Sequence, residues 1–320
     1  MIPIRPKILP LAALALGLST LPPCQAATTA VVTSAPVGLV TIEAKGGAGV
    51  QSLAVPLEPS PAYAGVISGV RKRTLIVKGA NWSTSSRVPS DTPGLNPLVA
   101  RMTSGRGDGR TFEIASREGD QLRLATNEDL TATISRGDRF EILPSDTLGS
   151  LFGTDGRGLT TNEDPDQADN VSLLKDGKWE TYYHNGRRWL RVGDASRVNR
   201  NATPIVPGEG FLFVRRTAAP FALQVSGNVP EDPAFSAPPA VSLALVGNPF
   251  PTTRRLGAVA DELDLERGRG WDSISVRTAE GWQRYFPKGR QWVSEGGSVS
   301  RRGPLVDAGT AVLVERAANP

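Results

Sequence analysis

A pattern of aromatic residues occurs twice in this chain and limits what the chain can fold into. The first copy lies between positions 169 and 216 and the second between 272 and 316. Its members are Trp179, Tyr182, Tyr183, Gly186 and Trp189 in the first copy and Trp282, Tyr285, Phe286, Gly289 and Trp292 in the second. Every pair is separated by 103 positions, so the two copies align without a gap. The chain is therefore expected to contain two related modules.

Each copy has turn residues placed as in a β-meander. Asp176-Gly177 and Asn185-Gly186 stand where tight hairpin turns need residues that tolerate a positive φ. The aromatic residues then fall on consecutive strands. The whole chain, with Gly 34 and Pro 26 among 320 residues, has short apolar runs between frequent turn residues. This pattern predicts an all-β protein with two tandem β-sandwich-like modules.

Composition excludes several kinds of site. The chain has one histidine, His184, and one cysteine, Cys24, so a structural zinc site has too few ligands. A Ser-His-Asp triad would have to use His184, which the second copy replaces by Pro287. The net charge is only +4, and the arginines are scattered along the sequence. Nucleic-acid binding needs a concentrated positive surface, so it is not expected.

The first 26 residues have the features of a secretory signal peptide. Arg5 and Lys7 precede the apolar stretch 8–18, which is too short to span a bilayer. Cleavage is expected after Ala26; a lipoprotein signal acylated at Cys24 is the alternative, which Pro22 and Pro23 disfavour. The mature chain is then exported to the periplasm, the cell surface or the medium, with no membrane span and no disulfide.

The order of predicted elements suggests an insertion. The first module comprises residues 27–61 and 144–220, the second comprises 221–320, and the block 62–143 is a small β-barrel of five or six strands inserted into the first. The expected strands of the insertion are Gly65–Val70, Thr74–Lys78, Leu98–Thr103, Thr111–Ala115, Gln121–Ala125 and Arg139–Leu143. Long insertions at exposed turns cost little, because loop-closure entropy rises slowly with length.

Short helices are expected at equivalent places in the two modules. In the first, Ser145 or Asp146 caps a helix that runs through Phe152, because a side-chain oxygen there accepts an orphaned backbone N–H. In the second, the helical turn covers Leu256–Ala260.

The tryptophans have two interpretations. As core residues, each contributes about 1.5–3 kcal/mol of burial free energy, and two copies of a module share folding needs. As exposed residues, they form a platform on which sugar rings stack. The candidates for such a glycan platform are Trp82, Trp179, Trp189, Trp271, Trp282 and Trp292.

An acidic run at 163–170 is the one candidate for a metal site. Asp164, Asp166 and Asp169 offer the alternating carboxylates that Ca²⁺ prefers, but the glycine and terminal glutamate of an EF-hand loop are missing. The alternative is a solvated loop, with no cofactor.

Several longer stretches of the chain stand out. They include VGLVTIEAKGG from 37, DLTATISRGDRFEILPSDTLGSLFG from 129, IVPGEGFLFVRR from 205 and LVGNPFP from 245. Together these stretches resemble a family of uncharacterised exported β-rich proteins of verrucomicrobial and planctomycete-type bacteria. The resemblance covers nearly the whole mature chain and implies export and modular architecture. It implies no activity and no functional residue, and the second copy departs from it where Asp307 to Ala311 replace Pro207 to Phe211.

The sequence thus favours an exported or cell-surface protein that is structural or adhesive and not an enzyme. Its expected partner is a cell-envelope protein or a polysaccharide. A carbohydrate-binding module protein is the alternative, and a hydrolase that uses carboxylates is the third choice.

Overall fold

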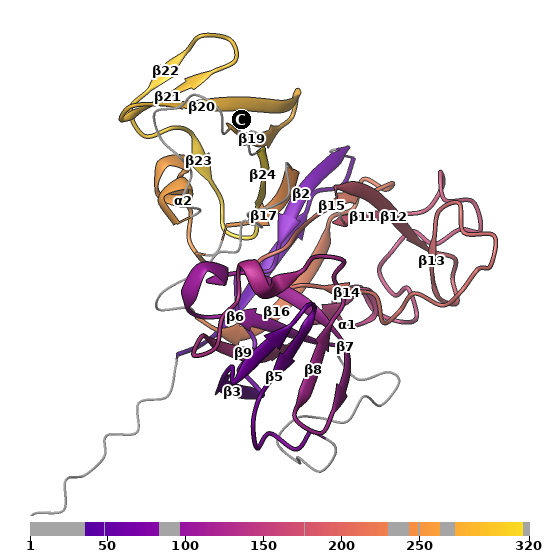
Figure 1. Cartoon of the computed structure of the whole chain (residues 1–320). Helices are drawn as coiled ribbons and strands as arrows, with labels where there is room; N and C mark the ends of the chain where they lie inside the picture. Colours follow the sequence, from indigo (N-terminus) through magenta and orange to yellow (C-terminus); the bar gives the residue numbers. More distant parts are fainter. Residues whose placement is uncertain are drawn as a thin grey trace, which may run out of the picture. The chain divides into compact units, whose positions relative to one another are not determined.

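The computed structural model confirms the all-β fold class. It describes residues 36–47, 49–82, 97–175, 177–229, 243–248, 250–262 and 273–315. The expected signal peptide, the turn residue Asp176 and the platform candidate Trp271 lie outside these residues. Antiparallel sheets make up the described part, with two short α-helices and two 3-10 turns, η1 (Gly105–Gly107) and η2 (Leu130–Ala132) (Figure 1). No helix in the described ranges is long and apolar enough to cross a bilayer.

The first module is built on a five-stranded antiparallel sheet with the order β13-β12-β11-β15-β2. Its strands are β2 (Val50–Ala54), β11 (Asn170–Lys175), β12 (Lys178–His184), β13 (Trp189–Arg191) and β15 (Gly210–Val214). The predicted meander is confirmed, since β12 pairs with β11 on one side and β13 on the other. A two-stranded sheet of β10 (Asp146–Thr147) and β14 (Pro204–Ile205) leads into helix α1 (Leu148–Phe152).

The second module is built on a six-stranded antiparallel sheet with the order β17-β24-β19-β20-β21-β22. Its strands are β17 (Leu243–Gly247), β19 (Ser273–Thr278), β20 (Gly281–Lys288), β21 (Gln291–Ser294), β22 (Val299–Ser300) and β24 (Ala311–Glu315). Here β18 (Arg254–Arg255) pairs with β23 (Leu305–Val306), and helix α2 (Leu256–Glu262) follows.

The two modules have the same strand order once β22 is set aside. Strands β2, β15, β11, β12 and β13 stand in the places of β17, β24, β19, β20 and β21. The start of each helix is held by the same backbone hydrogen bond. The Leu148 N–H donates to the Thr203 carbonyl at 3.1 Å, and the Leu256 N–H donates to the Pro304 carbonyl at 2.8 Å. In each module, the first turn of the helix is thus bound to the residue that precedes a short strand, β14 in the first module and β23 in the second.

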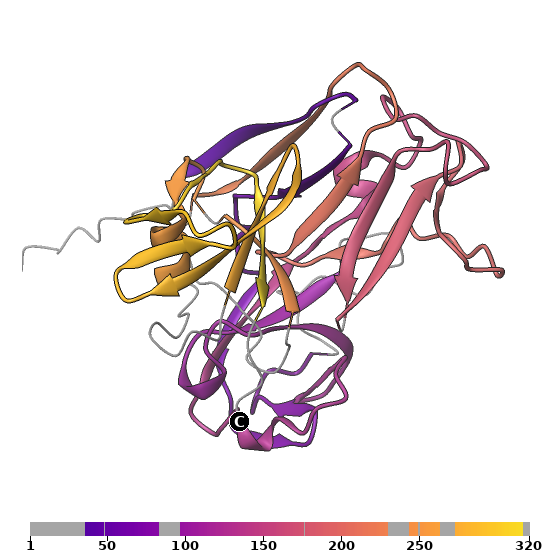
Figure 2. The same ribbon diagram turned by 90° about the horizontal axis from the view of Figure 1, so that it is seen from above.

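Strand β1 (Val37–Ala44) pairs with β16 (Phe221–Asn228) over its full length, and Figure 2 shows the two strands side by side. The sequence predicts that Phe221 begins the second module. In the structure, the strand that it begins pairs with β1 of the first module instead. Leu223 and Val225 of β16 are buried in the core of the first module together with Ile42 of β1. Alternating apolar residues indicate a strand but do not specify its partner, so sequence alone could not place β16.

Contacts between the modules occur in exchanged pairs. Gly210, which begins β15, faces Ala311, which begins β24: a Cβ added at Gly210 would lie 2.3 Å from the Ala311 Cβ. Likewise, Gly247 at the end of β17 faces Ala54 at the end of β2, where an added Cβ would lie 2.5 Å from the Ala54 Cβ. The Ala54 N–H donates to Gly309, and the Gly247 N–H donates to Gly208. In each pair, only a glycine allows the two backbones to approach this closely.

The block between β2 and β10 forms a separate sheet of seven strands, in the order β3-β9-β6-β7-β8-β5-β4. The strands are β3 (Tyr63–Val66), β4 (Gly69–Arg71), β5 (Thr74–Ile76), β6 (Leu98–Met102), β7 (Thr111–Glu118), β8 (Gln121–Leu124) and β9 (Arg139–Pro144). The two edge strands, β3 and β4, are joined by only two residues, so the sheet must curl and bring its edges together. It forms a half-barrel around its own core, which includes Leu75, Leu122 and Phe140.

One expected strand of this inserted domain, Gly65–Val70, is in fact two. The chain turns at Ile67 and Ser68, whose N–H groups donate to the carbonyls of Asp138 and Ile76 respectively. Asp138 directly precedes β9 and Ile76 is the last residue of β5, so the chain changes partner at this point. A pattern of alternating residues does not reveal such a change.

An ion cluster fixes the inserted domain to the first module. Arg101 of β6 is buried and donates from both terminal nitrogens to the Glu58 carboxylate, at 2.7 and 2.8 Å. Its Nε donates to Glu141 of β9 at 2.6 Å. Glu58 precedes the insertion and exchanges two backbone hydrogen bonds with Asn228 of β16. A bidentate, buried arginine holds a defined geometry, so this cluster orients the insertion.

The cap of α1 differs from the expected one. Thr147, not Ser145 or Asp146, caps the helix: its hydroxyl accepts the Ser150 N–H, and the Ser150 hydroxyl accepts the Thr147 N–H, which makes a capping box. Ser145 is instead buried and donates to the Ile205 carbonyl. Three consecutive residues of capping type cannot be ranked by sequence, because the pairing of β10 with β14 decides where the helix begins.

Candidate functional site

Two of the platform candidates are core residues of the two modules. The Trp189 side chain is 0% exposed and that of Trp292 is 3% exposed. The indole of Trp189 donates to the Gly153 carbonyl at 2.9 Å, just beyond α1, and its ring packs on Phe152. The indole of Trp292 lies beside Gly257 of α2. Each tryptophan thus fills the space beneath the short helix of its module, where no sugar can reach it.

The remaining platform candidates are spread over the molecule. Trp82 is buried in the inserted domain, where its ring meets the edge of Tyr63 at 5.0 Å. Trp282 is half-buried beside the guanidinium of Arg277. Trp179 is 42% exposed. Of the five described candidates, only Trp179 presents a largely open ring, so the structure does not bring them together in one platform.

The acidic run is tied to the backbone and to arginine. Asp169 is buried, accepts the N–H groups of Thr160 and Arg216, and pairs with the Arg215 guanidinium. Asp164 accepts the N–H of Asp166 in a tight turn. No group of three or more candidate metal ligands occurs in the described ranges. The calcium hypothesis for Asp164, Asp166 and Asp169 therefore gains no support from their geometry.

His184, the one histidine of the chain, is buried at the end of β12. Its Nε2 is 3.1 Å from the Thr154 carbonyl, and its Nδ1 accepts the Gly186 N–H at 3.1 Å. Both ring nitrogens are thus engaged with the backbone. This arrangement fixes the β12–β13 turn and leaves no nitrogen for a catalytic base.

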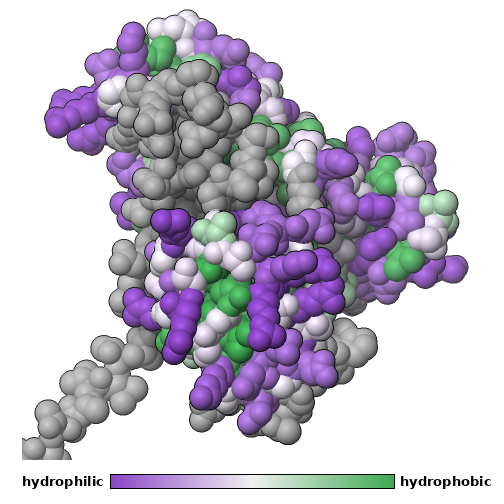
Figure 3. Space-filling view, viewed as in Figure 1, coloured by the Kyte–Doolittle hydropathy of each residue, from purple (hydrophilic) through white to green (hydrophobic). Residues whose placement is uncertain are grey.

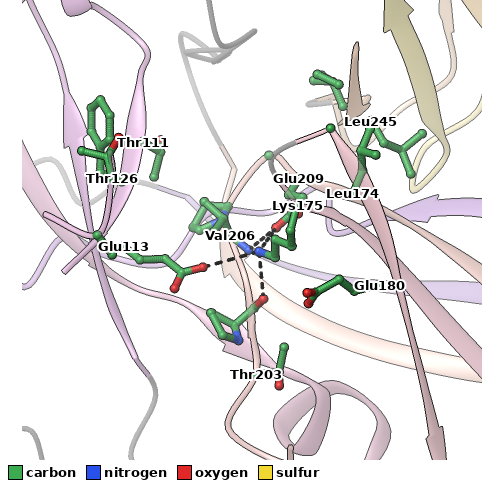
Figure 4. A pocket seen from close by; sticks show the side chains of 18 of the residues that line it. Thr111, Glu113, Thr126, Leu174, Lys175, Glu180, Thr203, Val206, Glu209 and Leu245 are labelled. Atoms are coloured by element: carbon green, nitrogen blue, oxygen red, sulfur yellow. Dashed lines mark hydrogen bonds and ion pairs between the residues drawn. The ribbon is translucent and has the colours of Figure 1, made fainter. Parts of the chain in front are cut away.

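A cavity of about 500 Å³ is the candidate site. It is lined by the inserted domain, by the first module and by strand β17 of the second module (Figure 4). Its lining includes Glu113 of β7, Lys175 of β11, Glu180 and Tyr182 of β12, Glu209, and Leu245 of β17. A cavity of this volume suits a small ligand, and its walls combine apolar surface with several polar groups.

Lys175 lies at the centre of this lining. Its ammonium group is 3.0 Å from a Glu209 oxygen and 3.5 Å from a Glu113 oxygen, and it also donates to the Pro204 carbonyl at 3.4 Å. Figure 4 shows both carboxylates directed at the same nitrogen. Burial alone would lower the pKa of Lys175, but the two carboxylates outweigh it and the pKa is raised. The lysine therefore stays charged and joins the inserted domain to the first module.

A second polar group lies on the wall formed by β12. The Tyr182 hydroxyl donates to Glu180 at 2.5 Å, and the Arg191 guanidinium donates to the other Glu180 oxygen at 2.6 Å. Burial and the neighbouring Glu180 carboxylate raise the pKa of Tyr182. Tyr182 therefore remains a neutral hydroxyl throughout the physiological range.

Two polar atoms of the lining residues have no partner. Within the described ranges, Thr111 Oγ1 and Arg200 Nε are buried without a hydrogen bond. Buried polar atoms are nearly always satisfied, so each calls for an explanation. A ligand with oxygen acceptors would satisfy both, because a hydroxyl and a guanidinium N–H are both donors.

The sequence did not reveal this cavity. Lys175 and Glu209 are 34 positions apart, and Glu113 belongs to the insertion, so only the tertiary fold brings the three together. No spacing rule connects them. The turn residues that flank them, such as Gly208, were visible only as loop signals.

Comparisons with known proteins add no assignment. No protein-family model matches the chain, and the searches of curated proteins and of solved structures give no match either.

Proposed function

We propose that this chain is an exported protein of the cell envelope with a structural or adhesive role, and that it acts by holding partners and not by catalysis. One observation carries the proposal: Trp189 and Trp292, the most conspicuous residues of the repeat, are anchors of two separate cores. The residues that recur in the two modules are therefore ones that the fold itself needs, which supports an architectural role for the protein. The resemblance to exported β-rich proteins is in keeping with this role.

The proposal includes a duplicated module. The shared strand order, the equivalent helix contacts and the constant offset of 103 positions support two copies of one unit, the first of which carries the inserted domain. Export is supported by Arg5, Lys7 and the apolar stretch 8–18.

Cell fractionation tests export. The full chain, produced with a C-terminal tag in a diderm bacterium, should appear outside the inner membrane with Ala27 as its first residue. The matched variant Leu14→Arg/Leu16→Arg interrupts the apolar stretch and should leave the unprocessed chain inside the cell. An uncleaved wild-type chain in the cytoplasm would refute export.

The cavity supports a second candidate, a carbohydrate-binding protein. The observation that favours it is the pair of unpartnered donors, Thr111 Oγ1 and Arg200 Nε, in a lining that already holds several carboxylates. A saccharide offers many hydroxyl oxygens to such donors and many hydroxyl protons to the carboxylates. The sugar-binding site would then be the cavity and not a platform of tryptophans.

A thermal-shift screen of residues 27–320 against neutral oligosaccharides tests this candidate. A ligand that binds only the folded state raises Tm by mass action. At a free ligand concentration of a hundred times Kd, it adds about 2.7 kcal/mol to the free energy of unfolding. Thr111→Val removes the unpartnered hydroxyl at nearly constant volume and should abolish the shift without lowering the Tm of the free protein. Thr41→Val, at an exposed position of β1, is the control. A shift that survives Thr111→Val would rule out the cavity as the sugar-binding site.

A further inference from the structure

Six cations gather at one corner of the second module. They are Arg254 and Arg255 of β18, Lys288 and Arg290 in and after β20, and Arg301 and Arg302 after β22, and all six are exposed. We call this set the basic corner. Figure 3 shows hydrophilic residues gathered over this end of the module, and Figure 1 shows β21 and β22 there.

Backbone contacts bring these segments together. The Gly257 N–H, just after β18, donates to the Arg302 carbonyl at 3.0 Å, and an Arg255 side-chain nitrogen donates to the Gly303 carbonyl at 3.4 Å. The turn that holds Arg290 is joined to them through β21, because Trp292 pairs with Ser300, directly before Arg301. The buried Trp292 indole beside Gly257 fixes the two halves of the corner to each other.

The corner has no internal neutralisation. Within the described ranges, none of the six cations forms an ion pair with a carboxylate, whereas Arg284 elsewhere in the same sheet pairs with Glu315 at 2.7 Å. Asp307, which follows the partner of Arg254 in the strand pairing, accepts the Thr253 hydroxyl at 3.0 Å. Like charges that face one another without counter-charges repel, and an anionic partner relieves that repulsion.

The corner differs from the matching place in the first module. There, Asp146 and Thr147 stand in β10 where the second module has Arg254 and Arg255 in β18. Arg200, which occupies the position of Arg301, pairs with Asp194 at 2.8 Å. Of the six cations, Arg290 matches an exposed arginine of the first module, Arg187, and the rest of the basic corner belongs to the second module.

The chemistry of the corner indicates a carboxylated sugar polymer. Five of the six cations are arginines, whose planar guanidinium groups bind carboxylate oxygens in pairs, whereas lysine serves as a point charge. The Arg254 guanidinium also lies over the half-buried ring of Phe250, 4.5 Å from its centroid, which adds an aromatic surface of the kind that packs against sugar rings. We propose that the basic corner binds an acidic polysaccharide through its carboxylate groups.

This inference extends the proposed adhesive function by naming the class of partner, and it rests on that function for where the polymer is met. Binding itself is a property of the folded protein. It can therefore be measured on purified residues 27–320, independently of whether the chain is exported.

Binding to immobilised polygalacturonate is the test, with neutral dextran, anionic phosphatidylglycerol vesicles and duplex DNA as comparison surfaces. Arg254→Gln/Arg255→Gln/Arg301→Gln/Arg302→Gln should weaken binding to polygalacturonate by at least about tenfold. The control, Arg71→Gln/Arg106→Gln/Arg123→Gln/Arg136→Gln, removes the same charge from exposed positions of the inserted domain and should bind like wild type. Raising NaCl from about 0.1 M to about 1 M shortens the screening length from about 10 Å to about 3 Å and should release the polymer.

Every other outcome overturns the inference. Equal losses in the two quadruple variants would mean that net charge alone attracts the polymer. Equal or tighter binding to the vesicles or to DNA would assign the corner to a lipid surface or to a nucleic acid. An export failure in the fractionation experiment leaves a positive binding result standing, so the two proposals fail separately.

Discussion

The two modules share a skeleton and differ in almost everything placed upon it. Each has a meander, a short helix and a tryptophan beneath that helix. At the turn after β2, the first module opens into the inserted domain. At the same turn after β17, the second module closes at once, because the buried Asn248 amide donates to the carbonyls of Thr252, Val306 and Asp307. A few core contacts thus define the module, and its turns are free to accept either a domain or a compact loop.

The treatment of charge differs in the same way. In the first module, lysine and arginine side chains such as Lys175 and Arg200 are paired with carboxylates around the cavity. In the second, the arginines of the basic corner face solvent. The same strand arrangement therefore carries cations neutralised by neighbouring carboxylates in the first module and an exposed cationic surface in the second.

The largest expected effect tests whether the two tryptophans are equivalent. Trp189→Ala and Trp292→Ala should each lower the free energy of unfolding by about 3–5 kcal/mol, because each empties a buried site that the short helix covers. Urea unfolding followed by far-UV circular dichroism measures the loss. Trp179→Ala, at an exposed position of β12, should change stability by no more than about 0.5 kcal/mol. A near-neutral Trp292→Ala would show that the second module does not depend on the shared anchor.

An intermediate effect tests the exchanged contacts between the modules. Gly210→Ala places a Cβ 2.3 Å from that of Ala311 and should cost about 1–3 kcal/mol. Adding Ala311→Gly should restore most of the loss, since the pair then has the same atoms in exchanged positions. The coupling energy of this double-mutant cycle measures the contact. Strictly additive costs would mean that the modules move apart and do not press together at this point.

The smallest effect concerns the ion pair that the first module has and the second lacks. Hydrogen bonds from Ser196 and Arg200 lower the pKa of Asp194 to about 2, below its ordinary 3.8. A carboxyl group with a lowered pKa stabilises the fold above its unfolded pKa, and that stability is lost as the pH falls through the folded pKa. The Tm difference between wild type and Asp194→Asn should therefore be largest near neutral pH, shrink as the pH falls below about 4 and vanish below pH 2. A Tm difference that stays constant from neutral pH to acid pH would contradict this prediction.

Much of the fold could be predicted from local pattern. The strand Val37–Ala44 and the helix start at Leu256 appear where alternation and the match between the copies indicate them. Pairings that the tertiary fold selects could not be predicted. The partner of β16, the turn at Ile67 and the choice of Thr147 as cap all depend on which distant backbone group is available.

The candidate site was still less accessible to sequence reasoning. Of the recurring tryptophans, Trp189 and Trp292 are buried in the cores of the two modules, so their recurrence reflects folding and not ligand binding. Lys175, Glu113 and Thr111 carry no motif, and their relation exists only after the inserted domain has docked on the first module.

The pairing of β1 with β16 has a consequence for the order of folding. The Ser52 hydroxyl bonds to the Ala311 carbonyl, 259 positions away, and β1 finds its partner only at β16. Contacts between positions so distant in the chain slow folding, because a large loop must close before they form. Because synthesis proceeds from the N-terminus, the inserted domain can complete its own sheet before β15 and β16 are made. Until then, the edges of β1 and β2 stay unpaired. That interval is when the chain is most exposed to aggregation, and a chaperone that covers residues 37–54 would act there.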